Sequence, residues 1–401
     1  MKAVILAAGE GKRLRPFTET ITKVMLPLIN KPVLEWNLIH AKQAGQRDFL
    51  FIIGCRDEDV RSYFQDGLAW NVHIDYVNQG KPQGTGHAIG IVEPFVDDFL
   101  VLSGDTIFNS KDIKKSKEHK QSIGLYTVDN PKDYGIVETK ENTIIQIHEK
   151  MKQPFSNLIN AGLYHFDNSI FSSLSELTRS PRGEYELTDA INIATEHQPF
   201  STLYLNEWRD VGYPWDLLNA NKILMNNLDF NQQGTIEQTA TLKGPIYLGE
   251  ESVIKNGSYI EGPVVIGKHC TIGPNCYIRP HTCIGDHCHI GNACEIKNSI
   301  IMNNSNIPHQ NYVGDSIIGR NCNLGSGTKI ANLHLDKKNI TVHLNGKKIN
   351  TNRRKLGTII GDNVQTGINS MINVGTLIGN NAFIGPGALA NGEIQPQTRL
   401  F

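Results

Sequence analysis

The chain has 401 residues, with 39 lysine and arginine against 40 aspartate and glutamate residues, and a formal net charge of −1. This length allows two domains with a sizeable core each, and the balanced charge gives no bulk field that would attract nucleic acid. No apolar run approaches the ~20 residues of a membrane span, and the N-terminus leads directly into a strand-like run. We therefore expect a cytoplasmic protein without signal peptide, membrane segment or nucleic-acid partner.

The first element is an apolar run at residues 2–6, which predicts a buried strand, and a glycine-rich cationic segment follows it. Gly9 and Gly11 let the backbone approach a ligand closely, and the three cations after them suit a polyphosphate. The segment is not a P-loop, because Arg13 stands where Ser or Thr is needed. It is not a dinucleotide loop either, because Leu14 replaces the required Gly. From the glycines alone, an ordinary turn with solvated cations stays open.

The neighbouring residues add a specific pattern. Leu6-Ala-Ala-Gly-Glu-Gly-Lys-Arg-Leu-Arg-Pro16, then Thr22-Lys-Val-Met-Leu-Pro27 and Lys31-Pro32, resemble the signature of the sugar-nucleotide pyrophosphorylases, which are nucleotidyltransferases. The resemblance implies that a sugar 1-phosphate attacks the α-phosphorus of a nucleoside triphosphate in line and expels pyrophosphate, so that no protein nucleophile is needed. It places the following residues at the nucleotide: Leu6, Ala8 and Gly9 as contacts, and Arg13 and Lys23 as catalytic cations on the triphosphate.

Apolar runs alternate with helical stretches through the first half of the chain. Strands are expected at 49–54, 72–77, 99–103 and 122–128. Asp57 is expected to cap a helix that ends near Gly67. The βαβα order predicts a mainly parallel sheet with helices on both faces and ligands at the carboxyl ends of its strands. The loops at Gly9, after Val77 and after Ser103 should therefore share one crevice.

Two later segments carry candidate ligands for the nucleotide and a metal ion. The resemblance assigns base contacts to Gln79, Gly84 and Thr85 and implies UTP or dTTP, whereas the residues alone are also typical of a mobile surface loop. Asp105 follows a buried strand, where a carboxylate can hold Mg²⁺ against phosphate oxygens, although a turn aspartate is about as common there. The resemblance makes Asp105 a metal ligand with Asp210 as its partner, so that Mg²⁺ is the expected cofactor.

Further matches to the same family imply a sugar pocket. The residues assigned to the sugar phosphate are Gly135, Glu149, Lys150 and Asn160. A carboxylate and an amide suit sugar hydroxyls, because each can hold paired hydrogen bonds. The segment 184–189, Glu-Tyr-Glu-Leu-Thr-Asp, resembles the start of a helix in that family. Singly, each of these residues is more often part of a turn or cap.

A change of pattern marks the second half. Residues 214–225 predict a helix, and the polar stretch 229–234 follows, so domains are expected at 1–229 and 236–401. Beyond it, an aliphatic residue followed in most repeats by glycine recurs every six residues, which is the sequence signature of a β-helix. The pattern resembles the left-handed hexapeptide β-helix, whose members usually form trimers. The expected α/β fold is a Rossmann-like nucleotidyltransferase mixed sheet followed by a left-handed parallel β-helix, in a homotrimer.

Cysteines are concentrated in this repeat. The seven lie at 55, 270, 276, 283, 288, 294 and 322, and four histidines stand among them. A metal cluster is one interpretation, but no Cys-x-x-Cys pair is present. Cys270, Cys276, Cys288 and Cys294 share one phase, four residues after an aliphatic position. We therefore expect stacked, buried thiols.

Two interruptions of the repeat, at 302–313 and about 333–356, suggest function. Residues 308–315, Pro-His-Gln-Asn-Tyr-Val-Gly-Asp, resemble the acetyltransferase motif of the bifunctional bacterial enzymes that make UDP-N-acetylglucosamine, and archaeal relatives of similar length resemble the chain throughout. The resemblance implies that His309 is the general base, because a neutral imidazole can take the proton of the attacking amine. The amino-sugar phosphate would be held by Arg279, Lys297, Tyr312, Asn321, Asn332 and Lys355.

The chain departs from the bacterial enzymes in three places. Its second interruption is longer, Leu333-His334 replaces a Tyr-Asp pair, and Ile368 stands where a serine belongs to the acetyl-CoA region. The coenzyme contacts and the choice between glucosamine and galactosamine 1-phosphate therefore stay open. In a trimer the site would lie between adjacent subunits.

The sequence thus predicts acetylation of glucosamine 1-phosphate by acetyl-CoA and coupling of the product to UTP. Two alternatives stay open. One is a glucose-1-phosphate uridylyl- or thymidylyltransferase with a structural β-helix, against which His309 and its basic companions speak. The other is a non-catalytic regulatory or assembly subunit, against which Arg13, Lys23, Asp105 and Asp210 speak.

Overall fold

The computed structural model describes residues 1–54, 56–226, 228 and 230–401. The chain divides into two compact units. The first comprises Met1–Glu10, Thr22–Met25 and Pro32–Asp210, and the second comprises Gly11–Ile21, Leu26–Lys31 and Val211–Phe401. Asp229, where the domain boundary was expected, lies outside the described residues, and so does Cys55. The division into domains 1–229 and 236–401 stays a prediction. Across the described part of the chain, no helix is long and apolar enough to cross a membrane.

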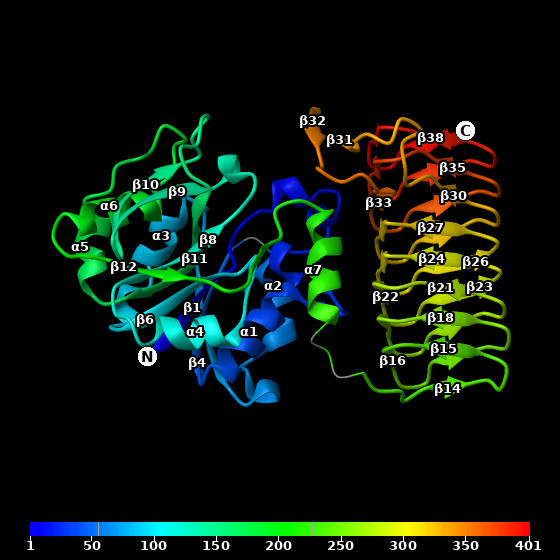
Figure 1. The fold of residues 1–401 in the computed structure, drawn as a ribbon, viewed down its shortest axis with the longest axis horizontal. Helices are drawn as coiled ribbons and strands as arrows, with labels where there is room; N and C mark the ends of the chain where they lie inside the picture. The colour runs from blue at the N-terminus through cyan, green and yellow to red at the C-terminus, as the bar shows by residue number, and fades with distance from the viewer. Residues whose placement is uncertain (55, 227, 229) are drawn as a thin grey trace. The chain divides into compact units, whose positions relative to one another are not determined.

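The first unit is built on a nine-stranded mixed sheet (Figure 1). In order across the sheet, its strands are β5 (His73–Asn78), β4 (Asp48–Ile53), β1 (Lys2–Leu6), β6 (Phe99–Ser103), β11 (Leu158–Phe166), β8 (Ser122–Thr127), β12 (Ser201–Tyr204), β10 (Thr143–Glu149) and β9 (Gly135–Lys140). The four strands β5, β4, β1 and β6 are parallel, whereas β11 runs antiparallel to both β6 and β8. The parallel expectation is therefore right for one half of the sheet. The strands β9 and β10 are antiparallel because a tight turn joins them directly.

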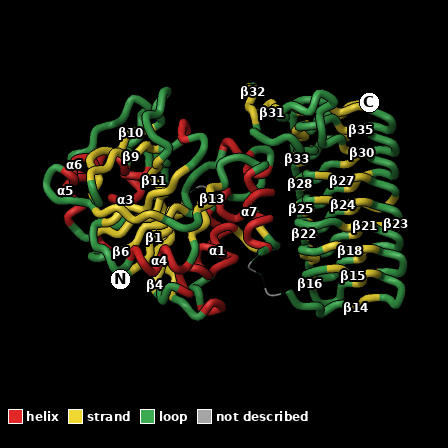
Figure 2. The backbone as a smooth tube through the Cα atoms, in the orientation of Figure 1, coloured by secondary structure: helices red, strands yellow, loops and turns green. Residues whose placement is uncertain are grey.

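Helices cover both faces of this sheet (Figure 2). One face packs against α3 (Thr85–Gly90), α5 (Ser169–Ser175) and α6 (Leu187–Thr195), and the other against α1 (Val33–Gln43), α2 (Asp57–Phe64) and α4 (Ser110–Ser116). Successive side chains of a strand point to opposite faces of the sheet, so the sheet has a hydrophobic core on each face. Val4 and Val101 pack in one cluster with Ile191 of α6, whereas Phe51 packs edge to face against Phe64 of α2.

The cap expected for helix α2 is wrong. Arg56 occupies the N-cap position with a φ of 61°, and Asp57 is the first helical residue. The carboxylate of Asp57 instead accepts a hydrogen bond from Arg61, one turn further along, at 3.0 Å. The helix ends at Phe64, three residues before Gly67, whose φ of 87° closes the next turn.

The second unit contains helix α7 (Asp216–Met225) and a left-handed β-helix with three parallel walls (Figure 1). Wall 1 consists of β14 (Thr235–Ile236), β17 (Val253–Ile254), β20 (Thr271–Ile272), β23 (His289–Asn292), β26 (Asn306–His309), β29 (Asn323–Leu324), β34 (Gln365–Thr366), β37 (Phe383–Ile384) and β40 (Arg399–Leu400). Wall 2 consists of β15 (Thr241–Lys243), β18 (Tyr259–Glu261), β21 (Tyr277–Ile278), β24 (Glu295–Lys297), β27 (Tyr312–Gly314), β30 (Lys329–Ile330), β35 (Met371–Ile372) and β38 (Leu389–Ala390). Wall 3 consists of β16 (Ile246–Leu248), β19 (Val264–Ile266), β22 (Thr282–Ile284), β25 (Ile300–Ile301), β28 (Ile317–Ile318), β33 (Thr358–Ile360), β36 (Thr376–Ile378) and β39 (Glu393–Ile394). Each coil runs from wall 1 to wall 2, then to wall 3, and then to wall 1 of the next coil. The three turns between the walls are named the 1/2, the 2/3 and the 3/1 corner.

The aliphatic position of each repeat points inward, as expected. Ile272 pairs with Ile290 and Ile290 pairs with Ile307, and all three are fully buried. The first interruption of the repeat is not an insertion. Coils here are one residue short at the 2/3 corner, where Lys297-Asn298-Ser299 and Gly314-Asp315-Ser316 turn the chain, and strands β26 and β27 continue the stack.

The four cysteines of one repeat phase, Cys270, Cys276, Cys288 and Cys294, lie in the interior of the β-helix together with Cys322, which confirms the stacked interpretation. Cys283 instead hydrogen-bonds to Asn30 Oδ1 at 3.1 Å. Cys276 Sγ donates to the carbonyl of Gly291 at 2.8 Å, and Cys288 Sγ to that of Met302 at 3.3 Å. Burial raises the pKa of Cys276 and of Cys322 to about 12, so these thiols do not offer the thiolates that a metal needs. Among the residues described, no three His, Cys, Asp or Glu side chains are grouped to hold a metal ion.

The second interruption forms an ordered hairpin. Its strands are β31 (Thr341–Leu344) and β32 (Lys347–Asn350), and Leu333 and Lys355 bridge its base. Ile340, Val342 and Leu344 are buried where the hairpin packs against strands β36 and β39 of wall 3. The insertion therefore leaves the β-helix at the 2/3 corner and folds back onto wall 3.

We predict that Ile290→Ala destabilises the β-helix by about 2–5 kcal/mol, because the cavity would lie between two coils that cannot collapse independently. Denaturant unfolding followed by far-UV circular dichroism measures the change. Asn306→Ala, at an exposed position of the next coil, is the control and should stay near zero. Equal effects of the two substitutions would contradict the stacked core.

Candidate active sites

The carboxyl ends of the parallel strands lie along one edge of the first unit. Backbone hydrogen bonds tie them together, from Ala7 N to the carbonyl of Ile52 at 2.8 Å and from Gly104 N to that of Leu6 at 3.0 Å. A side chain at Gly104 would come within 2.4 Å of the Leu6 carbonyl oxygen. The loop with Leu6, Ala8 and Gly9 is thus held at the edge where ligands of such sheets bind.

The expected base loop is fixed at the same edge. The backbone N–H of Gln79 donates to Ile53 at the end of β4, and its side chain donates to the carbonyl of Gly84 at 3.0 Å. Gly84, with a φ of 114°, is the N-cap of helix α3, and a side chain there would meet Tyr185. Thr85 Oγ1 accepts a hydrogen bond from Leu187 N at 3.1 Å. The loop is therefore clamped to the start of helix α6.

Strand pairing brings the two expected metal ligands together. Strand β13 (Trp208–Asp210) runs antiparallel to β7 (Thr106–Phe108), and Asp210 pairs with Thr106, directly after Asp105. Lys23, at the start of a short 3₁₀ helix, forms an ion pair with Asp105. A carboxylate in the turn before β7, a carboxylate at the end of β13 and one lysine are thus brought together, which is a donor set that fits Mg²⁺ beside a phosphate.

The sugar-pocket residues gather at the other end of this group. Tyr134 OH donates to Asp210 at 3.1 Å, and the next residue, Gly135, pairs in register with Glu149. A side chain at Gly135 would come within 3.3 Å of Glu149 Oε2 and 3.7 Å of Asn160 Cβ. Lys150 follows with a φ of 48°. The small residue therefore leaves an opening between a carboxylate and an amide.

Glu149 has unsatisfied hydrogen-bonding capacity. Within the described part of the chain, its Oε2 atom is buried without a hydrogen-bond partner, and Arg182 reaches Oε1 only at 3.6 Å. Burial, partly offset by Arg182, raises the pKa of the Glu149 carboxyl above its ordinary value. A sugar hydroxyl would supply the missing hydrogen bond.

Arg13 belongs to the second unit. Its guanidinium lies 5.1 Å from the ring centre of Tyr213, and the segment Gly11–Ile21 is fastened to the 3/1 corner of the β-helix. Asn380 Nδ2 donates to the carbonyl of Pro16 at 2.9 Å, and Thr20 Oγ1 donates to Asp362 at 2.7 Å.

Five expected acetyltransferase residues meet at the 2/3 corner, around the buried carboxylate of Asp315. Lys297 Nζ lies 3.1 Å from Asp315 Oδ2, and Asn332 Nδ2 donates to the same oxygen at 2.6 Å. The hydroxyl of Tyr312 lies 3.2 Å from Asn332 Nδ2. The other two members at this corner are Arg279 and Lys355.

The other two expected residues lie elsewhere on the coil. His309 ends strand β26 at the 1/2 corner, where it is exposed, and Asn321 turns the 3/1 corner beside Asn303 and Asn363. Within a single chain, His309 and Asn321 therefore lie at other corners than the five residues at the 2/3 corner.

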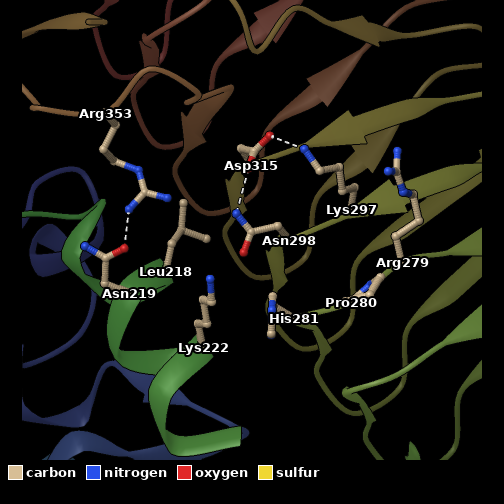
Figure 3. Close-up of a pocket in the computed structure, with 10 residues that line it drawn as sticks. All are labelled: Leu218, Asn219, Lys222, Arg279, Pro280, His281, Lys297, Asn298, Asp315 and Arg353. Atoms are coloured by element: carbon tan, nitrogen blue, oxygen red, sulfur yellow. Dashed lines mark hydrogen bonds and ion pairs between the residues drawn. The ribbon is translucent and has the colours of Figure 1, made fainter. Parts of the chain in front are cut away.

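Three candidate residues were missed in the sequence. Asp315 is part of the motif at 308–315 without an assigned role, although Lys297, Asn298 and Asn332 all bond to it. Figure 3 shows the bonds from Lys297 and Asn298. Arg182 pairs with Glu186 at 2.7 Å and faces Glu149. Its position two residues before the segment 184–189 was the available signal. Arg353 lies in the insertion, and no pattern singled it out.

We predict that Glu149→Gln stabilises the protein at pH 8 and that this gain disappears as the pH falls below the ordinary pKa of glutamate. Because burial raises the pKa of Glu149, ionisation costs folding free energy only as the pH rises through that pKa. Thermal unfolding between pH 4 and pH 8 measures the gap. Glu141→Gln, at an exposed turn, is the control. A stability difference between Glu149→Gln and the unaltered chain that does not change with pH would contradict the raised pKa of Glu149.

Comparisons with known proteins match both halves of the chain. Residues 2–227 match the Nucleotidyl transferase family, and residues 260–377 match the GMPPB C-terminal domain family. In Bacillus anthracis, a structure assigned as a glucose-1-phosphate thymidylyltransferase shares 32% identity, covers 58% of this chain and 98% of its own, and gives a TM-score of 0.53. A UDP-glucose pyrophosphorylase structure at 23% identity shares the fold, with a TM-score of 0.51 over 57% of this chain and 99% of its own.

Curated relatives match over the whole length. The bifunctional protein GlmU of Methanocaldococcus jannaschii is 41% identical, and that of Methanococcus maripaludis strain C7 is 46% identical, each across 100% of this chain and 97% of the relative. The bifunctional sugar-1-phosphate nucleotidylyltransferase/acetyltransferase of Sulfurisphaera tokodaii is 43% identical over 98% of both chains. The chain therefore belongs to the nucleotidyl transferases and, over its full length, to the family of bifunctional sugar-1-phosphate nucleotidylyltransferase/acetyltransferases.

Proposed function

We propose that this protein acetylates glucosamine 1-phosphate with acetyl-CoA and transfers UMP from UTP to the resulting N-acetylglucosamine 1-phosphate, giving UDP-N-acetylglucosamine and pyrophosphate. The observation that carries the first unit's role is the pairing of β13 with β7, which sets Asp210 beside Asp105 and Lys23. Family membership over the full length supports the pair of reactions.

In nucleotidyl transfer, a phosphate oxygen of the sugar 1-phosphate attacks the α-phosphorus, and the bond to the β-phosphate oxygen breaks. The attacking oxygen is already anionic, so the protein has to position the groups and neutralise charge. We assign base contacts to Gln79, Gly84 and Thr85, and sugar contacts to Glu149 and Asn160. Lys23 and Arg13 are assigned to the phosphates.

Asp105 and Asp210 are the residues that would hold Mg²⁺, which supplies charge neutralisation between phosphate oxygens. Tyr134 donates a hydrogen bond to Asp210 and thereby orients one carboxylate. Trp208 anchors the same strand, because its indole N–H donates to the carbonyl of Ala161 at 2.8 Å.

In acetyl transfer, the amine of the amino sugar attacks the thioester carbonyl, loses a proton, and expels the thiol of coenzyme A. His309 is assigned as the base that takes this proton. Because His309 and the 2/3 corner lie apart on one coil, a homotrimer in which adjacent subunits present different corners supports the reaction better than a single chain. We place the protein in the cytoplasm, where its nucleotide and coenzyme substrates occur.

For nucleotidyl transfer, we predict that Arg13→Ala lowers kcat by about 10²–10³-fold with little change in KM for UTP, because the cation acts on charge that develops in the transition state. Pyrophosphate release with UTP and with dTTP measures the effect and the nucleotide preference. Arg47→Ala, an exposed arginine of the first unit, is the control. An unchanged kcat removes Arg13 from the reaction.

For acetyl transfer, we predict that His309→Ala abolishes coenzyme A release from acetyl-CoA and glucosamine 1-phosphate while UTP-dependent pyrophosphate release continues. Chromatographic detection avoids interference from the thiols of the protein. His343→Ala, in the exposed part of the hairpin, should behave like the unaltered chain. If the unaltered chain releases pyrophosphate but no coenzyme A, the β-helix is a scaffold, and if it releases neither, the chain is a non-catalytic subunit.

A further inference from the structure

The turn of the β31–β32 hairpin contacts the cationic loop that carries Arg13, and both belong to the second unit. Asn345 Nδ2, at this turn, donates a hydrogen bond to the carbonyl oxygen of Lys12 at 3.1 Å. Figure 1 shows the hairpin beside wall 3, at the coils nearest the C-terminus. The insertion in the acetyltransferase half of the chain therefore reaches the loop assigned to nucleotidyl transfer.

The hairpin turn holds this donor in a fixed position. Asn345 and Gly346 form a two-residue turn, with the positive φ angles of 52° and 71° that such turns require. Their backbone N–H groups donate to the two carboxylate oxygens of Glu393 on strand β39, at 3.2 Å and 3.4 Å. Every second side chain of strand β31 is buried, which fastens the hairpin below the turn. The hydrogen bond to Lys12 thus starts from a side chain whose backbone is already ordered.

The acceptor belongs to the peptide group that joins Lys12 to Arg13. Because a peptide group is planar, a hydrogen bond at the Lys12 carbonyl also fixes the direction of the Arg13 N–H group. Lys12–Leu14 is a 3₁₀ helix of three residues, and so short a helix leaves carbonyl groups to be satisfied from outside. At the far end of the side chain, the Arg13 guanidinium lies 5.1 Å from the ring centre of Tyr213. Arg13 is therefore restrained at its backbone by Asn345 and at its charged end by Tyr213.

The loop has two further anchors on the β-helix, and both act at a greater distance along the chain. Asn380 donates to the carbonyl of Pro16, and Thr20 donates to Asp362. These contacts lie three or more residues beyond the catalytic arginine, whereas Asn345 acts on the peptide bond directly before it. Loss of the Asn345 side chain should therefore leave the loop attached while the backbone of the arginine becomes less constrained.

We propose that Asn345 is a positioning residue for nucleotidyl transfer, which acts by holding the peptide group that precedes Arg13. The proposal rests on the role assigned to Arg13 above. A cation that stabilises charge developing on the phosphates is most effective when its position is set before the reaction. The insertion then has a part in both reactions, because Lys355 at its base is assigned to acetyl transfer.

The test compares Asn345→Gly with the unaltered full-length chain in UTP-dependent pyrophosphate release. Glycine accepts the φ of 52° and keeps the backbone N–H that reaches Glu393, so the substitution removes only the side-chain donor. We expect kcat to fall by about three- to tenfold, as for the loss of one neutral hydrogen bond, with little change in KM for UTP. Asn345→Asp keeps the size of the side chain but accepts instead of donating, and it should lower kcat at least as much.

A matched control and a double-mutant cycle separate positioning from a general structural effect. Asn352→Gly is the control, because Asn352 is another exposed asparagine of the insertion with a positive φ, 54°, and its kcat should equal that of the unaltered chain. In the Arg13→Ala background, Asn345→Gly should lower kcat no further, because a residue that acts through Arg13 loses its effect when Arg13 is removed. A general disturbance of the fold would lower kcat equally in both backgrounds.

An unchanged kcat in Asn345→Gly, or an equal fold loss with and without Arg13, would overturn the positioning role and leave nucleotidyl transfer standing. A lowered kcat in Asn345→Gly beside a fully active Arg13→Ala variant would overturn both the positioning role and the role of Arg13. If the unaltered chain releases no pyrophosphate from UTP, the proposed nucleotidyl transfer fails and the positioning role fails with it.

Discussion

The inward stacking of one aliphatic residue per hexapeptide is the constraint on which the second unit depends. Each coil must place its isoleucine over that of the previous coil, so the strands have almost no freedom to vary, as Ile272, Ile290 and Ile307 illustrate. Variation is confined to the corners. The shortened turns at Asn298 and Asp315 and the 333–356 insertion all occur at the 2/3 corner, where five of the residues expected for acetyl transfer lie. The architecture thus directs chemical residues to the one place where the stack tolerates them.

In the first unit, the register of the paired strands positions the candidate site residues. Its candidate groups come from segments as distant as Lys23 and Asp210, yet each is placed by pairing or by a backbone hydrogen bond at the end of a strand. Glycines at 104 and 135 clear the space, because a side chain at either position would collide with the Leu6 carbonyl or crowd Glu149. The sheet therefore holds a polar site in which Glu149 keeps a buried oxygen without a hydrogen-bond partner in the described part of the chain, and this leaves it capacity for a ligand.

Helix α7 and the segment Gly11–Ile21 belong to the same compact unit as the β-helix. Asn380 and Asp362 hold Pro16 and Thr20, while Asn219 holds Arg353. The loop that carries Arg13 and the insertion at the 2/3 corner are therefore parts of one compact unit.

The sequence by itself determined the elements whose signals are periodic or local: the strand at 2–6, the inward isoleucines, the buried cysteine phase and the glycine-rich loop. These follow from short-range rules, in which side-chain period and backbone freedom decide the outcome. Only the tertiary structure decided that Arg56 and not Asp57 occupies the cap of α2, that the break expected at 302–313 comes from shortened corners at 297–299 and 314–316, and that Arg353 meets Asn219. Those outcomes depend on which segments pack together, and residues 134 positions apart leave no common pattern in the sequence. Likewise, His309 and Arg279 are only thirty positions apart in the sequence, but His309 lies at the 1/2 corner and Arg279 at the 2/3 corner.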